Sequence, residues 1–110
     1  MGTRKYLGEF EQMVLLAILQ RGRDANGYEV RQELEDVAER KVSKGAFYTT
    51  LDRLEDKGFL RWEARAATNG RGGDLPQRHF EVTPAGMEEL RKSRQTLLKL
   101  WSGFESALGG

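Results

Sequence analysis

The chain has 110 residues, which suits a single domain with a modest hydrophobic core. It contains no cysteine and only one histidine, so disulfides, thiolate metal sites and metal sites made of several histidines are excluded. The formal net charge is only +1, and any surface that binds nucleic acid must therefore come from local clustering of basic side chains.

Residues 8–22 predict a first helix, because apolar side chains recur along it at spacings of three and four. The stripe consists of Phe10, Met13, Val14, Ala17 and Ile18, and it is widened by Leu15, Leu16 and Leu19. So wide a stripe favours burial on two sides, against the domain itself and against a partner chain. The apolar run at 13–19 is much shorter than the roughly 20 residues that cross a bilayer, and no signal-peptide pattern precedes it. We therefore expect a cytoplasmic protein with no membrane partner.

Two more helices are expected before residue 58. The Asn26-Gly27 pair is typical of a turn or a helix cap, and the second helix would carry an apolar face of Tyr28, Val30, Leu34 and Val37. Ser43 suits the N-cap of the third helix, and Gly58 suits its left-handed stop. The buried side of the third helix would carry Phe47, Leu51 and Leu54.

A two-stranded hairpin is expected next, because residues 59–66 and 78–82 alternate in polarity around a loop rich in glycine at 67–77. Arg61, Glu63 and Arg65 would face outward. The inward residues of the hairpin would be Leu60, Trp62, Ala64, Phe80 and Val82. Together with the third helix they predict a core of Phe47, Leu51, Leu54, Leu60, Trp62, Phe80 and Val82.

A long last helix should begin at Thr83-Pro84, where threonine caps and proline suits the first turn. Its apolar stripe runs through Met87, Leu90, Leu97, Trp101, Phe104 and Leu108. This seam of about three heptads, interrupted by Arg94, indicates a dimerisation helix. The predicted fold is α+β and mostly helical: a winged helix-turn-helix at 1–83 followed by a C-terminal dimerisation helix at 84–110, together one compact domain.

The chain resembles the PadR family of bacterial transcriptional regulators over about residues 7–104. The third helix carries the pattern Gly-x-x-Tyr-x-x-Leu-x-x-Leu-Glu in Gly45, Tyr48, Leu51, Leu54 and Glu55. "NGYEVRQELE" is similar to the family's second helix, and "RHFEVTPAG" to the segment from the wing into the last helix. The resemblance implies a dimeric, DNA-binding regulator whose first and last helices form the dimer.

The DNA contacts are expected at the start of the third helix, because a helix-turn-helix inserts its second helix into the major groove and helix N-termini suit phosphate. The expected contacts are Ser43, Lys44, Gly45, Tyr48, Thr49 and Arg53, with Arg71 from the loop of the wing. For Tyr48, packing within the domain remains an alternative. Residues 57–79 hold five Lys or Arg against two acids, which predicts a positive patch, and the roles of Arg61 and Arg65 stay open. Asp52 and Asp56 would lie beyond the groove.

The dimer interface is expected at Leu15, Leu19, Leu90, Leu97, Trp101, Phe104 and Leu108. Trp101 and Phe104 are also candidates for a pocket that binds a small aromatic effector, although packing in the dimer core is the favoured role. The leading interpretation is a dimeric repressor that binds double-stranded DNA at a palindromic operator. The alternative is a winged-helix module that binds another protein. No catalytic motif stands out, so we expect neither an enzyme nor a cofactor.

Overall fold

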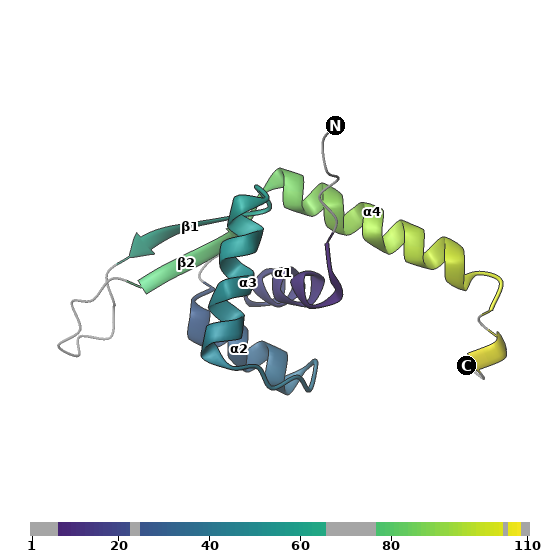
Figure 1. Cartoon of the computed structure of the whole chain (residues 1–110), viewed down its shortest axis with the longest axis horizontal. Coiled ribbons are helices and arrows are strands. Elements are labelled where there is room, and N and C mark those ends of the chain that lie inside the picture. Colours follow the sequence, from purple (N-terminus) through teal and green to yellow (C-terminus); the bar gives the residue numbers. More distant parts are fainter. Residues whose placement is uncertain (1–6, 23–24, 66–76, 105, 109–110) are drawn as a thin grey trace.

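The computed structural model describes residues 7–22, 25–65, 77–104 and 106–108 (Figure 1). Within these ranges the chain forms four α-helices and one antiparallel hairpin, as the sequence predicts for a winged helix-turn-helix. The elements in chain order are α1 (Glu9–Arg21), α2 (Gly27–Asp36), α3 (Lys44–Asp56), β1 (Leu60–Arg65), β2 (Gln77–Val82), α4 (Pro84–Trp101) and the short 3-10 helix η1 (Ser106–Leu108).

Helices α2, α3 and α4 each begin after a short polar N-cap residue, at the position that the sequence predicts. The Asn26 side chain accepts a hydrogen bond from the Glu29 amide at 2.9 Å, and the Ser43 hydroxyl accepts one from Ala46 at 3.1 Å. The Thr83 hydroxyl does the same for α4, where Pro84 follows in the first turn. Each cap satisfies an amide that has no partner within the helix.

The core lies between α1, α2, α3 and the hairpin. Antiparallel pairing sets Leu60 opposite Val82 and Trp62 opposite Phe80. On the other edge of β2, the Phe80 amide donates to the Ala25 carbonyl at 2.9 Å, so β2 is held from both sides. The largest fully buried side chains are Phe47, Phe80, Leu15, Ile18, Leu34, Leu54, Val14 and Val30.

Some residues expected in this core lie at the surface. Trp62 is 37% exposed while its partner Phe80 is 1% exposed, because the hairpin leaves the core as it runs toward its loop. Tyr28 and Val37 are 72% and 68% exposed. The buried stripe of α2 begins at Gly27 rather than Tyr28, and the helix ends before Val37, which is its C-cap.

The last helix is shorter than predicted. It ends at Trp101, and the next residues form a tight turn in which the Phe104 amide donates to the Trp101 carbonyl at 2.7 Å. Serine and glycine at 102 and 103 have low helix propensity, which explains the stop. The apolar seam within α4 therefore extends only to Trp101.

Close backbone packing joins α4 to the hairpin. A Cβ atom at Gly86 would lie 2.4 Å from the Phe59 carbonyl oxygen and 2.9 Å from Val82 Cγ1, so only glycine fits there. Leu90 is also buried, but the apolar residues farther along the helix are exposed. Figure 1 shows α4 extending away from the helices and hairpin.

An ion pair joins the first and third helices. Lys57, the C-cap of α3, donates to both carboxylate oxygens of Glu11 at 2.8 and 2.9 Å, and the Gly8 amide donates to the same carboxylate at 2.8 Å. Burial acts to raise the pKa of Glu11, but these hydrogen bonds and the positive charges of Lys57 and Arg53 outweigh it and lower the pKa below its ordinary value.

Because the pKa of Glu11 is lower in the folded chain, its stabilisation is present above the unfolded-state value of about 4.3 and is lost as pH falls through the folded-state value. Glu11→Gln should lower the free energy of unfolding by about 1–3 kcal/mol at pH 7. In urea titrations from pH 7 to pH 3 this deficit should shrink toward zero. The exposed Glu35 provides the control, since Glu35→Gln should change little at any pH. A deficit that stays constant with pH would contradict the assignment.

Candidate nucleic-acid interface

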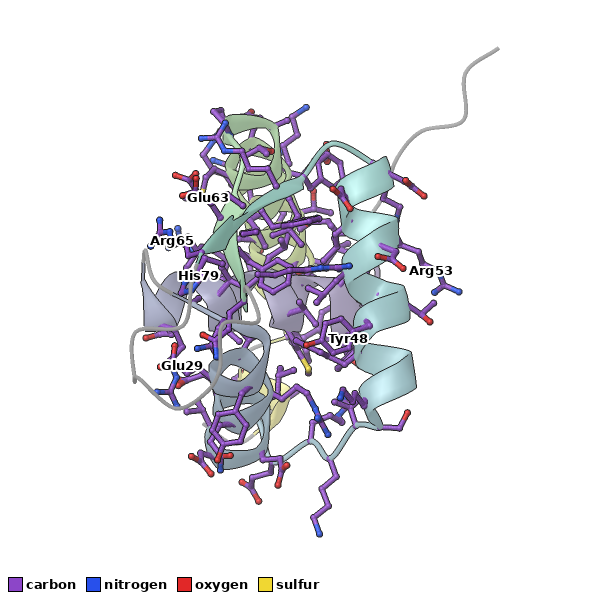
Figure 2. All side chains as sticks on the ribbon, turned by 90° about the vertical axis from the view of Figure 1, so that its left-hand side faces the viewer. Glu29, Tyr48, Arg53, Glu63, Arg65 and His79 are labelled. Atoms are coloured by element: carbon purple, nitrogen blue, oxygen red, sulfur yellow. The ribbon has the colours of Figure 1, made fainter. Side chains whose placement is uncertain are left out.

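The first turns of α3 form a solvent-exposed polar surface. Ser43, Lys44, Gly45, Thr49 and Arg53 are all exposed, as the sequence predicts. In Figure 2 Arg53 points away from the rest of the molecule. The opposite side of α3 packs in the core through Phe47, Leu51 and Leu54. The exposed side of α3 is therefore accessible to a ligand that lies along this helix.

Tyr48 is partly buried, and it contacts both the core and a surface cleft. Its ring packs edge-to-face on Phe47, with ring centroids 5.2 Å apart, and it points inward from α3 (Figure 2). A Cβ atom on Gly27 would lie only 2.3 Å from the Tyr48 hydroxyl oxygen, so the ring rests against the start of α2. The ring is thus part of the packing, while the hydroxyl lies at the edge of a surface cleft.

This cleft separates α3 from the hairpin and has a volume of about 580 Å³. Its walls come from the start of α2, one side of α3 and the beginning of β2. The lining residues are Asn26, Gly27, Tyr28, Tyr48, Asp52, Gln77 and Arg78.

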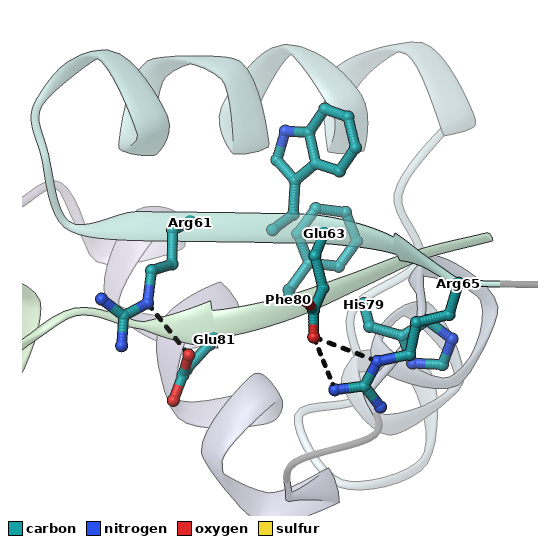
Figure 3. Close-up of a pocket in the computed structure, with 7 residues that line it drawn as sticks. Arg61, Glu63, Arg65, His79, Phe80 and Glu81 are labelled. Carbon is teal, nitrogen blue, oxygen red and sulfur yellow. Dashed lines mark hydrogen bonds and ion pairs between the residues drawn. The ribbon is translucent and has the colours of Figure 1, made fainter. Parts of the chain in front are cut away.

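The outer face of the hairpin carries paired charges. Arg61 donates to Glu81 across the strands at 2.9 Å, and Arg65 donates to Glu63 at 2.8 Å (Figure 3). Glu63 lies opposite His79 on the same face. Arg61 and Arg65, whose roles the sequence leaves open, thus pair with carboxylates on the face that is turned away from the core.

The inner face carries a different arrangement. Arg78 lies opposite Ala64, one pair beyond Trp62 and Phe80, and its guanidinium carbon is 4.5 Å from the centroid of the Trp62 ring. Within the described part of the chain, Arg78 has no carboxylate at salt-bridge distance. The positive patch predicted from composition is thus smaller than a residue count suggests, since Lys57, Arg61 and Arg65 are paired. Arg71 lies outside the described residues.

An apolar groove of about 950 Å³ lies between α1 and α4. Leu19, Leu90 and Leu97, which the sequence assigns to a dimer interface, line this groove, and so do Leu16, Met87 and Leu98. Leu15 does not belong there, because it is completely buried in the core of its own chain. Trp101 and Phe104 are exposed near the end of α4. The side chain of Leu108 lies outside the described residues.

Sequence reasoning missed Leu98, and it counted Arg78 in the positive patch without giving it a contact of its own. Alternation along β2 places Arg78 on the same face as Phe80, so that signal was present in the sequence. For Leu16 on α1 and Leu98 on α4, the spacing of apolar residues indicates only that each helix has a wide apolar stripe. Their position in the groove depends on how α4 crosses α1.

The contact between Gly27 and Tyr48 yields a double-mutant test. Gly27→Ala should lower the free energy of unfolding by about 1–3 kcal/mol, since the new methyl group displaces the tyrosine ring. In a Tyr48→Ala background the same change should stabilise by about 0.5–1 kcal/mol, as alanine favours helix over glycine. Gly45→Ala is the matched control, because a Cβ atom there meets nothing within 4 Å. Equal effects of Gly27→Ala in both backgrounds would show that this packing is not formed.

Comparison with solved structures identifies the fold. The chain matches a PadR-like transcriptional regulator from Bacillus cereus with a TM-score of 0.72 and 22% identity, covering 92% of each chain. It also matches F93 from STIV, a winged-helix DNA-binding protein, with a TM-score of 0.67 and 22% identity, over 87% of this chain and 95% of the other. No helix in the described ranges has the length and apolar character needed to cross a membrane.

Sequence comparison gives the family. The chain is 35% identical over 99 residues to an uncharacterized 37.1 kDa protein in transposon Tn4556 of Streptomyces fradiae. The match covers 88% of this chain but 26% of that protein, so the chain spans about a quarter of its relative's length. Residues 15–92 match the model described as the transcriptional regulator PadR-like family. The chain therefore belongs to the PadR-like family of transcriptional regulators.

Proposed function

We propose that the protein is a dimeric repressor that binds a palindromic operator through α3 and the wing. The observation that carries this proposal is the exposed start of α3, where a capped helix presents only polar or small side chains beside the cleft to the hairpin. A helix of this kind can enter the major groove while its opposite side stays in the core.

Each residue on this surface has a role in the proposal. Ser43 caps the helix, and Lys44 is positioned for phosphate at its N-terminal end. Gly45 has no internal neighbour that requires a glycine, so its missing side chain matters on the outside, where backbone and DNA can approach closely. Thr49 and Arg53 lie one and two turns farther along, for contact with base edges and flanking phosphates. Tyr48 offers its hydroxyl, and Arg71 extends the contact from the loop of the wing.

The apolar groove between α1 and α4 supports the dimer. Leu16, Leu19, Leu97 and Leu98 line it and are each exposed in a single chain. The Cα radius of gyration is 16.1 Å, against about 13 Å for a compact domain of this length, and α4 is one of the elements that extend from the rest of the molecule. A second copy would cover the groove, and two-fold symmetry would place two copies of α3 on two half-sites.

The protein would repress transcription if its operator overlaps a promoter. The proposal also places the protein in the cytoplasm. In a two-fold dimer the exposed Trp101 and Phe104 of each chain can approach their copies. We assign them first to dimer packing. A small aromatic effector that fits between the rings is the second role consistent with their exposure.

Thr49→Ala tests the assignment of base contact. Binding would be measured by fluorescence anisotropy on an operator selected from random DNA, on variants of it and on scrambled DNA. We expect a loss of roughly 1–3 kcal/mol on the best operator and a change in the preferred base at one position of each half-site. Thr96→Ala is the matched control, because Thr96 is exposed on α4, far along from the hairpin.

Unchanged preference in Thr49→Ala would show that α3 is not the reading helix. If the wild type also showed no salt-dependent binding to any DNA, the alternative of a protein-interaction module would replace the proposal.

Leu97→Glu tests the dimer. Leu97 lines the apolar groove, whereas Leu100 is exposed on the same helix and does not line it. Leu97→Glu should therefore shift micromolar protein toward the monomer in sedimentation, since a carboxylate would be buried at the interface, while Leu100→Glu should remain dimeric. A dimer that tolerates Leu97→Glu, or a wild type that sediments as a monomer, would contradict the interface.

A further inference from the structure

Arg78 is distinguished from the other described arginines of the hairpin by its face and its surroundings. Arg61 and Arg65 lie on the outer face and each is paired with a glutamate. In Figure 2, Glu63 and Arg65 lie on the side away from α3. Arg78 belongs to the inner face with Phe80, and it lines the cleft beside α3 together with Tyr48 and Asp52.

The position of this cleft matters for any ligand that α3 and the wing bind together. When a helix lies in the major groove and a wing reaches the adjacent minor groove, the sugar-phosphate strand that divides the two grooves must pass between them. In this protein that place is the cleft between α3 and β2.

We propose that Arg78 contacts a backbone phosphate at this cleft, and that Trp62 is the positioning residue that holds its guanidinium there. This inference rests on the proposed binding of DNA by α3 and the wing. It adds a contact from β2 near the loop end of the paired strands, which is distinct from the contact proposed for Arg71 in the loop.

Trp62 lies on β1, and its partly exposed ring contacts the guanidinium of Arg78 on β2. A guanidinium 4.5 Å from the ring centroid is within the range of a cation–π interaction. Stacking leaves the edge of the guanidinium and its N–H donors available, so one side of the group packs on the ring while the donors reach an anion. An arginine that is already ordered loses less side-chain freedom when it binds phosphate.

Local charge also fits a phosphate at the rim of the cleft and not deep inside it. Asp52 lines the α3 wall, and a phosphate near it would be repelled. Arg78 lies on the hairpin wall, and its charge is not used by a carboxylate within the described residues. Arg78 therefore offsets Asp52 and favours the backbone on the hairpin side of the cleft.

The test uses the full chain and the operator selected from random DNA, with affinity measured across a salt series. Arg78→Gln should weaken binding to operator and scrambled DNA by about the same factor and reduce the salt slope by about 0.9 per protomer, the value for one phosphate. Arg65→Gln is the matched control on the outer face and should leave the slope unchanged. Thermal melting would confirm that both variants fold.

Trp62→Leu and Trp62→Phe test the positioning role. Trp62→Leu should weaken binding in the wild-type background, but should have no further effect in an Arg78→Gln background. Trp62→Phe keeps an aromatic face and should restore most of the affinity. A salt slope unchanged by Arg78→Gln would overturn the phosphate contact, and additive effects of Arg78→Gln and Trp62→Leu would overturn the role of Trp62. Absence of DNA binding by the wild type would instead reject the proposed function itself.

Discussion

The burial of Phe80 determines which face of the hairpin lies beside α3. Its side chain fills the core, its amide is bound to the Ala25 carbonyl, and its strand partner is Trp62. Because side chains alternate along a strand, a slip of one residue would exchange the two faces of β2. Arg78 would then leave the cleft and His79 would enter it. The buried phenyl ring thus fixes which charges lie beside the helix proposed to read DNA.

A net charge of +1 is compatible with binding a polyanion where basic side chains cluster locally. Glutamates pair with Arg61 and Arg65 on the outer side of the hairpin, and Glu11 pairs with Lys57 behind α3. The exposed cations Lys44, Arg53 and Arg78 lie on α3 or beside its cleft. The acids Asp52, Glu55 and Asp56 are exposed farther along α3, so the positive charge is concentrated at the start of α3 and on the hairpin wall of the cleft.

Much of the fold follows from local sequence. Caps at Asn26, Ser43 and Thr83 and the left-handed Gly58 are chemical signals within a few residues, and they fix where helices begin and end. The sequence predictions were wrong where long-range packing determines which apolar side chains are buried. Alternation places Trp62 on the inner face, but the extent of the core under that face leaves it partly exposed. Likewise the width of the stripe on α1 does not reveal that Leu15 is buried and Leu16 lines the groove. The exposed start of α3 was predicted, whereas the pairing of Arg61 with Glu81 needed the strand register.

The central claim is that α3 and the hairpin of two copies read one DNA site together. Selection of bound sequences from a random pool with the purified full-length chain, followed by a salt titration of the best sequence, tests it most directly. We expect an inverted repeat whose half-site centres are about 10 base pairs, or a multiple of that, apart, with affinity that falls steeply as salt rises. Enrichment of no sequence, or binding that is insensitive to salt, would contradict the account.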